Sequence, residues 1–506
     1  MTGFRFGTLL FLAALLLPAQ QLRELEKRVT EFTLANGMHF ILLERHQVPV
    51  ISFHTLVSVG SAQDPAGQTG LAHLLGRLAF EGTETIGTRN WVAEKKAWDD
   101  VEEAYDRLAA ERAKGSRASQ AQIASLEVDV RREIGLAQSL ADAGEFERVI
   151  RQNGGVDLNS RTTPDATETS YGLPSNRVEL WFLMESQRLA HPVFREFYRE
   201  RAALMAENQN NPASKSPAQL QQALLATAFA AHPYRNPGLG WPSDIVNLRR
   251  PDAKAFFGTY YVPGNIVMGI VGDVDPANAR RLAERYFGAI PAKPLPPPVH
   301  TEEPPQPGPK AVTVWGNGQP LLLVGYKRPS QTDPADLAFD VIQTILSEGR
   351  TGWLYKELVE EKRIAQAAES TATFPAGRYG NLFVFTVVPA KDHTLEENQK
   401  ALEDLLARLA TKPVDAETLT RVKNMLRGRA LRLLGSNQQL AALLPAYYAG
   451  YGDWRKLFTA TTGFDHLTGE DLQAVAARYF APAYRTVAYY ADESQLPAPS
   501  GQRSPR

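Results

Sequence analysis

One stretch of the N-terminal half carries hydrophobic residues at helical spacing. Four leucines follow the i, i+3, i+4, i+7 pattern of a single helical face, namely Leu71, Leu74, Leu75 and Leu78. The pattern predicts a helix that buries this face, and Thr69 is placed to cap its start. His73 and Arg77 are one turn apart on a different face, with Gly76 beside them, so the His73 and Arg77 side chains are neighbours.

Apolar runs before this helix predict strands at 29–34, 38–44 and 50–59. Asn36-Gly37 separates the first two runs, and an Asn-Gly pair between apolar runs is a strong hairpin signal. Segment 91–146 differs, because it is rich in Ala, Glu, Arg and Lys and has few turn residues besides Gly115-Ser116. This composition predicts a helical hairpin inserted into the first half, which is either a partner-binding arm or a solvated decoration.

Two parts of the chain repeat each other. Leu248, Asp252, Tyr260 and Pro263 recur as Leu467, Asp471, Tyr479 and Pro482, each 219 positions later. The repeat predicts two copies of one α+β unit, at 21–290 and 311–492. Between them, 291–310 holds 9 of the 34 prolines, which predicts a stiff extended linker.

Composition excludes several classes of partner and chemistry. At 506 residues the chain is too long for one core. Lys+Arg of 55 against Asp+Glu of 56 gives a net charge of -1, so no overall field favours nucleic acid or an anionic membrane as a partner. The absence of cysteine excludes disulfides, thiolate metal sites and cysteine catalysis.

The first residues of the chain predict an exported protein. Arg5 precedes an apolar run from Phe6 to Leu17 and then Pro18-Ala19-Gln20, which is typical of a signal peptide over 1–20, with an uncleaved anchor as the alternative. We therefore expect a periplasmic or secreted protein without stable membrane insertion. The tail at 493–506 is rich in Pro, Ser and Gln and is predicted to be disordered.

The residues around the leucine-rich helix resemble the pitrilysin/insulinase family of zinc metallopeptidases, the inverted zincins. The resemblance is carried by Gly60-Ser61, by Gly70-Leu71-Ala72-His73 and by Phe80-Glu81-Gly82-Thr83. The family helix reads H-x-x-E-H, in which two histidines hold zinc and the glutamate is the general base. The corresponding residues here are His73, Gly76 and Arg77. The resemblance implies that the first ligand is retained and that the base and the second ligand are lost.

The segment from Phe197 to Glu207 resembles the family helix that supplies the third zinc ligand. Glu207 matches the ligand and Glu200 matches a supporting acid. Because an arginine guanidinium stays protonated in proteins, Arg77 would repel a divalent ion. We hypothesise that Arg77 forms a buried ion pair with Glu207 in the zinc position. His73, Arg77, Glu207 and Glu200 would then be a vestigial metal site without zinc, and the chain would have no catalytic residues.

Two further segments bear on the function. Residues 153–167 resemble a glycine-led edge strand that accepts substrate in active members, which predicts a peptide-binding edge at Gly155, Asn159 and Thr162, with simple turns as the alternative. In the second half, LSEGRTGWLYKELVEEKRIAQAAES resembles a segment where active assemblies place an arginine and, seven residues later, a tyrosine. Those positions hold Val359 and Gln366, and Arg350 is either a partial substitute or a turn residue.

These observations predict an α+β protein with two homologous halves, and the resemblance implies that the halves are α/β sandwiches, each a sheet covered by helices, that face one another as a clamshell. The resemblance implies a non-catalytic subunit of a heterodimeric zinc endopeptidase that encloses peptides or unfolded protein, with zinc held by a competent homologous partner. A stand-alone peptide-binding or scaffold protein is the alternative. An active zinc peptidase would require His73 and Glu207 to suffice.

Overall fold

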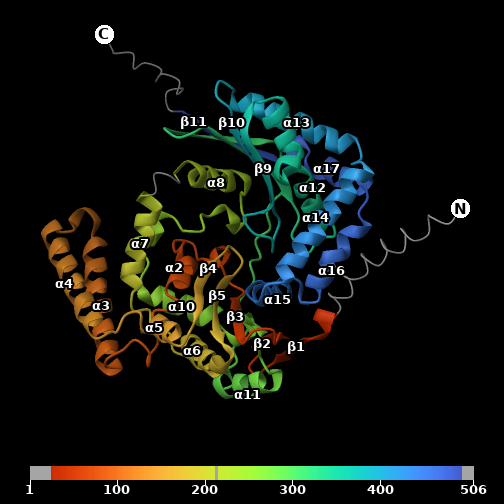
Figure 1. Ribbon diagram of the computed structural model, residues 1–506. Coiled ribbons are helices and arrows are strands. Elements are labelled where there is room, and N and C mark those ends of the chain that lie inside the picture. Colours follow the sequence, from red (N-terminus) through yellow and green to blue (C-terminus); the bar gives the residue numbers. More distant parts are fainter. Residues whose placement is uncertain (1–23, 211–214, 493–506) are drawn as a thin grey trace, which may run out of the picture.

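The computed structural model describes residues 24–210 and 215–492 of the chain. The expected signal peptide at 1–20 and the expected tail at 493–506 lie outside these residues. The described part is an α+β structure with two mixed sheets and helices around them (Figure 1). The expected fold class is therefore confirmed at this level.

The first sheet has six strands in the order β1-β2-β6-β3-β5-β4. The strands are β1 (Val29–Thr33), β2 (His39–Glu44), β3 (Val50–Val57), β4 (Val156–Thr162), β5 (Thr167–Pro174) and β6 (Ile266–Gly272). β1 and β2 form the antiparallel hairpin that Asn36-Gly37 predicts, and Gly37 has a φ of 96°, in the region that favours glycine. β2 and β6 are parallel, and the other neighbours are antiparallel.

The second sheet has five strands in the order β7-β11-β8-β10-β9. Its strands are β7 (Lys310–Gly316), β8 (Leu321–Arg328), β9 (Ala365–Phe374), β10 (Asn381–Pro389) and β11 (Arg485–Asp492). This order repeats β2-β6-β3-β5-β4 strand for strand, and β7 is parallel to β11 as β2 is to β6. The duplication read from the sequence is thus a duplication of topology.

The offset of 219 also holds for whole elements. Helix α10 (Arg250–Tyr260) and helix α17 (Gly469–Tyr479) begin and end 219 positions apart, as do the first residues of β6 and β11. Both helices begin in the same way, because the Asp252 carboxylate accepts the N–H of Arg249 (2.7 Å) and the Asp471 carboxylate accepts that of Thr468 (2.8 Å).

One face of each sheet packs against helices of its own half. In the first half these include α2 (Leu71–Arg77), α5 (Glu145–Gln152), α6 (Val178–Ala190), α7 (Phe197–Asn210), α9 (Pro242–Ile245), α10 and α11 (Pro276–Phe287). In the second half they are α12 (Asp336–Ser347), α13 (Leu395–Thr411), α14 (Ala416–Leu434) and α17. Each half therefore has its own hydrophobic core.

The other face of each sheet is covered by a helix from the opposite half. Helix α8 (Lys215–Ala228) packs on β7, β8 and β11, and α15 (Asn437–Tyr451), followed by α16 (Lys456–Gly463), packs on β2, β3 and β6 (Figure 1). The approach of α15 is close, because a Cβ on Gly269 would lie 2.0 Å from the carbonyl oxygen of Ala441. We call α8 and α15 the exchanged helices, because each packs on the sheet of the other half. The expected clamshell is not formed by these two halves, because the exchanged helices cover the sheet faces that would line it.

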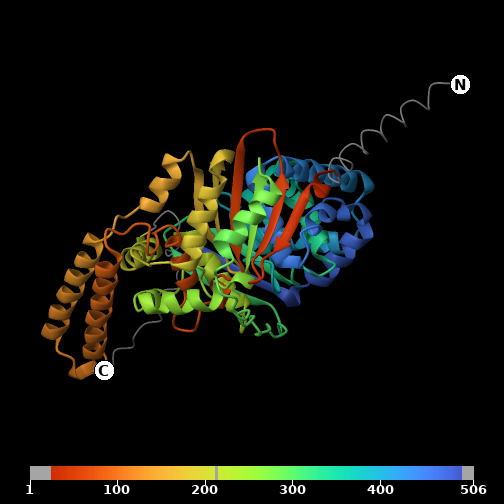
Figure 2. The same ribbon diagram turned by 90° about the horizontal axis from the view of Figure 1, so that it is seen from below.

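The helical hairpin expected at 91–146 is present as α3 (Trp91–Arg112) and α4 (Gln120–Ser139), and it projects away from both sheets (Figures 1 and 2). Its own apolar seam is small and consists of Ala104, Leu108, Leu126 and Val130. Residues 291–308 form no helix or strand. None of the helices in the described residues combines the length and apolar character that a membrane span requires.

Candidate functional site

Helix α2 is fixed at its start by two carboxylates. The Asp64 carboxylate accepts hydrogen bonds from the backbone N–H groups of Gly70 and Ala72, both at 2.8 Å. These N–H groups at the start of the helix have no acceptor within the helix itself. Thr69 is not the capping residue that the sequence predicts, because its hydroxyl donates to Asp244 at 2.7 Å. The N-cap position is Gly70, with a φ of 90°.

The leucine face of α2 is buried as expected, with Leu71, Leu74, Leu75 and Leu78 between 0% and 5% exposed. This packing fixes the rotation of the helix and directs the opposite face toward α7. His73 is partly buried, and this burial lowers the pKa of its imidazole, although the nearby Glu207 opposes the shift. At neutral pH the imidazole is therefore uncharged.

Arg77 joins α2 to α7 through two carboxylates. Its Nε donates to Oε2 of Glu200 at 2.9 Å, and its Nη1 donates to Oε2 of Glu207 at 3.1 Å. The pair with Glu207 that the sequence predicts is present, and Glu200 is a second partner. The expectation of a buried pair is wrong, because the Glu207 side chain is 45% exposed and that of Arg77 is 32% exposed, against 15% for Glu200.

A wider charge network surrounds this pair. Arg199 contacts Glu200 (3.2 Å), Glu81 (3.4 Å) and Glu196 (3.3 Å). Burial raises the pKa of the Glu81 carboxyl to about 7, and the neighbouring Glu196 and Glu200 act in the same direction, against Arg199. The sequence shows Glu81 only as part of a family-like motif, and no local pattern links it to Arg199.

Strand β4 fills the space beside Gly76. A Cβ at position 76 would lie 2.3 Å from Oγ1 of Thr162, and the Ser160 hydroxyl donates to the carbonyl oxygen of Gly76 at 2.7 Å. The Thr162 hydroxyl also donates to the carbonyl oxygen of Ala72, at 3.4 Å. Hence a side chain at position 76 requires the Thr162 side chain to move.

These residues do not fit a catalytic zinc ion. Such an ion needs three protein ligands and a carboxylate that acts on the bound water. Here a guanidinium lies on Glu207, and no group of three or more His, Asp or Glu side chains in the described residues is arranged to hold a metal. We therefore assign no chemical step to a metal at this position.

The expected peptide edge is β4, which is the last strand of the first sheet. Its three candidate residues are in different settings. The Asn159 side chain is exposed, and the Thr162 side chain faces α2. Gly155 precedes the strand and packs on α5, because a Cβ there would lie 2.3 Å from Cγ2 of Ile150. The register with β5 shifts between Val156 and Asn159, so regular pairing along β4 begins at Asn159.

The three candidates in the second half do not meet at a common site. Val359 packs against the second core, and the Gln366 side chain accepts a hydrogen bond from Gln319 at 3.2 Å. The Arg350 guanidinium lies 5.9 Å from the centre of the Tyr355 ring. Arg350 is thus part of a short turn after α12 and does not join the α2–α7 cluster.

Comparisons with known proteins agree with this architecture. Residues 40–97 match the family model "Insulinase (Peptidase family M16)", and residues 247–426 match "Peptidase M16 inactive domain". Zinc protease PqqE of Helicobacter pylori is 26% identical over 468 residues, which is 90% of this chain and 91% of that protein. The probable mitochondrial-processing peptidase subunit beta of Arabidopsis thaliana is 24% identical over 347 residues, covering 66% of this chain and 64% of that subunit.

A solved structure shows the same fold. A protease from Helicobacter pylori superposes with a TM-score of 0.76 at 23% sequence identity, covering 92% of this chain and 99% of that one.

Proposed function

We propose that this chain, a homologue of the M16 (insulinase/pitrilysin) peptidases, is a catalytically inactive subunit that binds peptides together with a zinc-competent homologous subunit. The observation that carries the proposal is the position of Arg77. In the family motif this residue corresponds to a zinc ligand, and here its guanidinium bonds both Glu200 and Glu207. A protonated guanidinium in this place disfavours a divalent ion by electrostatic repulsion.

The setting of Gly76 supports the loss of the general base. Glycine has no carboxylate to accept a proton, and Thr162 takes up the space that a longer side chain requires. A longer side chain at position 76 would therefore also require the Thr162 side chain to move. A single reverting substitution is therefore not expected to restore hydrolysis.

The relatives support a subunit role. One of them is named as a probable subunit beta of a mitochondrial processing peptidase, and residues 247–426 of this chain match a model described as an inactive M16 domain. Since the exchanged helices α8 and α15 cover the sheet faces between the two halves, a peptide-enclosing chamber would need a second chain. We propose export to the periplasm or the medium, on the basis of residues 1–20.

The test is purification of the tagged mature chain from its natural host. We expect an M16 homologue with an intact H-x-x-E-H motif to copurify, and we expect zinc and chelator-sensitive cleavage of a fluorogenic peptide to follow that partner. The isolated chain should hold zinc only substoichiometrically after dialysis. Stoichiometric zinc in the isolated chain, with chelator-sensitive cleavage that is lost in Glu207→Gln, would contradict the proposal.

One observation favours a second candidate, a peptide-binding or scaffold protein that works alone. The arginine and tyrosine that active assemblies of the family place in the second half are replaced by Val359 and Gln366, while β4 keeps the end position of its sheet. Backbone pairing at an edge strand needs no catalytic group. Recovery of only unrelated proteins or of a homodimer in the purification would favour this candidate.

A further inference from the structure

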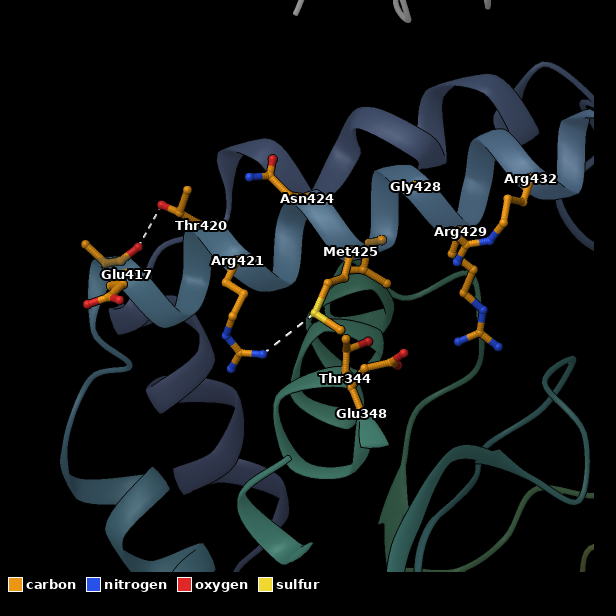
Figure 3. A pocket seen from close by; sticks show the side chains of 12 residues that line it. Thr344, Glu348, Glu417, Thr420, Arg421, Asn424, Met425, Gly428, Arg429 and Arg432 are labelled. Carbon is orange, nitrogen blue, oxygen red and sulfur yellow. Dashed lines mark hydrogen bonds between the residues drawn. The ribbon is translucent and has the colours of Figure 1, made fainter. Parts of the chain in front are cut away.

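A groove of ≈ 980 Å³ lies in the second half, between α12 and α14 (Figure 3). It is open to solvent along α14, and it adjoins a second cavity of ≈ 350 Å³ that shares Thr344, Leu426 and Arg429 with it. The second cavity is lined by apolar and aromatic side chains that include Leu433, Tyr447, Tyr451 and Phe464, and at one place by the acidic side chains of Asp336 and Asp340.

The groove repeats the α2–α7 site of the first half. Strand β8 begins and ends 271 positions after strand β3, its equivalent in the first sheet. At the same offset, Thr344 corresponds to His73 and Glu348 corresponds to Arg77. Helix α14 begins 219 positions after α7, which is the offset of the duplication. The two helix pairs are thus equivalent elements of the two halves.

The charges of the two helix pairs are reversed. In the first half the arginine is on α2 and the glutamates are on α7, whereas in the second half Glu348 follows α12 and the arginines Arg421, Arg429 and Arg432 are on α14. Figure 3 shows the Arg421 and Arg429 side chains extending from α14 on the side that faces α12. The α2–α7 site is therefore mainly acidic, whereas the equivalent groove of the second half is mainly basic.

These arginines are not neutralised by the chain in the way that Arg77 is. Arg421 donates to the hydroxyl of Thr351 at 3.1 Å and contacts the sulfur of Met425 at 3.7 Å, both of which are uncharged. Within residues 24–210 and 215–492, neither Arg429 nor Arg432 has a carboxylate at ion-pair distance, although Arg429 lies close enough to the buried Asp340 to oppose the rise that burial causes in the pKa of that carboxyl. Guanidinium groups without a carboxylate partner bind external carboxylates well, because the fork of N–H donors matches the two oxygens.

We propose that this groove binds an acidic segment of a polypeptide. Arg421 and Arg432 are 11 residues apart on one helix, which is about 16 Å along the axis and matches about five residues of extended peptide. Carboxylates of the peptide lie on the arginines, and its apolar side chains lie on Met425 and in the adjoining cavity. Glu348 and Glu417 at the groove, and a net charge of -1 for the chain, disfavour a polyanion such as nucleic acid.

This proposal goes beyond the proposed function and does not rest on it, because binding at α14 needs neither a metal nor a partner subunit. The test uses the purified mature chain and a short fluorescein-labelled peptide rich in Glu, Tyr and Leu. A matched peptide carries Lys in place of Glu. Fluorescence anisotropy should show saturable binding of the acidic peptide only, and the affinity should fall when NaCl is raised from about 0.05 M to about 0.3 M.

A pair of double variants locates the site. Arg429→Gln with Arg432→Gln should weaken binding of the acidic peptide by about fivefold to tenfold, since two exposed ion pairs are lost. The matched control is Arg107→Gln with Arg131→Gln, which removes the same charge from exposed positions of α3 and α4 and should leave the affinity unchanged.

Three results would overturn the proposal. They are equal binding of the Lys peptide, equal loss in the control double variant, and tighter binding of a DNA oligonucleotide or of phosphatidylserine vesicles with the same dependence on Arg429 and Arg432. None of these results depends on whether the α2–α7 site holds zinc, so failure of this proposal is distinguishable from failure of the proposed function.

Discussion

Thr162 on β4 occupies the space beside Gly76 on α2, where a Cβ atom would lie 2.3 Å from the Thr162 hydroxyl oxygen. The same hydroxyl donates to the carbonyl oxygen of Ala72, one turn earlier on the helix. The packing of helix α2 and that of the edge strand β4 therefore depend on each other, so a substitution at Gly76 alters the contacts of Thr162.

The first prediction tests this contact. Alanine is favoured over glycine inside a helix by about 1 kcal/mol, yet Gly76→Ala should lower the free energy of unfolding by about 1 to 3 kcal/mol because the stiff, β-branched Thr162 must shift. In a Thr162→Ala background the same change should be neutral or stabilising. Urea denaturation of the four proteins measures the coupling, and equal effects of Gly76→Ala in both backgrounds would refute the contact.

The second prediction concerns the two partners of Arg77. Glu200 is 15% exposed and contacts both Arg77 and Arg199, so Glu200→Gln should lower the free energy of unfolding by about 1 to 2 kcal/mol. Glu207 is 45% exposed, so Glu207→Gln should cost less than about 1 kcal/mol. A larger loss of stability in Glu207→Gln than in Glu200→Gln would contradict this order.

The third prediction is a pH dependence of stability that arises at Glu81. Burial raises the pKa of this carboxyl from 4.5 to about 7, so the folded protein binds a proton there that the unfolded chain has already released between these pH values. The contribution of Glu81 to stability is therefore largest below pH 4.5 and is lost as the pH rises to about 7.

Glu81→Gln removes this titration. Relative to the unchanged protein, the variant should gain on the order of 2 kcal/mol between pH 5 and pH 8, measured as the free energy of unfolding by urea. Glu284→Gln is a suitable control, because this side chain is 57% exposed and pairs only across one helical turn with Arg280. A parallel pH profile in Glu81→Gln and the unchanged protein would exclude Glu81 as the source.

Sequence patterns predicted the features that depend on neighbours along the chain. The buried leucine face follows from helical spacing, the β1–β2 hairpin follows from Asn36-Gly37, and the duplication follows from the offset of 219. Each of these is determined by local periodicity, turn chemistry or direct repetition, which the sequence displays without knowledge of tertiary contacts.

Apart from the Arg77–Glu207 pair, which followed from the family resemblance, features that depend on packing between distant segments were not predicted. The leucine pattern places Thr69 near the start of α2, but Asp64 holds the first turn, because a loop brings its carboxylate back to the helix. An amphipathic helix does not reveal which sheet it covers, so the exchange of α8 and α15 could not be read from the sequence. The exposure of Glu207 and the position of Thr162 likewise depend on how α7 and β4 approach α2.

The last prediction concerns the proline-rich segment between the halves. Composition predicts an extended linker, and the structure adds an anchor at Glu303. This carboxylate accepts the backbone N–H groups of Ala230, Ala231 and His232 at 2.8 to 3.0 Å and pairs with Lys327 at 2.8 Å. Glu303 thus holds the linker to the loop after α8 and to β8 of the second sheet.

The pKa of Glu303 follows from these contacts. Burial raises it, but the three N–H donors and Lys327 outweigh burial and lower it to about 2. Because the folded-state pKa lies below the usual 4.5, the stabilisation is present above pH 4.5 and is lost as the pH falls toward 2. Glu303→Gln keeps the shape of the side chain but removes the charge, so it should lower the free energy of unfolding at pH 7 by about 1 to 3 kcal/mol.

Loss of the anchor should also expose the linker to proteases. We expect limited proteolysis of Glu303→Gln at neutral pH to cut between 291 and 310 faster than in the unchanged protein, because cleavage requires the linker to detach. Glu302→Gln is the matched control, since Glu302 is an exposed neighbour in the same linker. Equal cleavage rates in the two variants would show that Glu303 does not hold the linker.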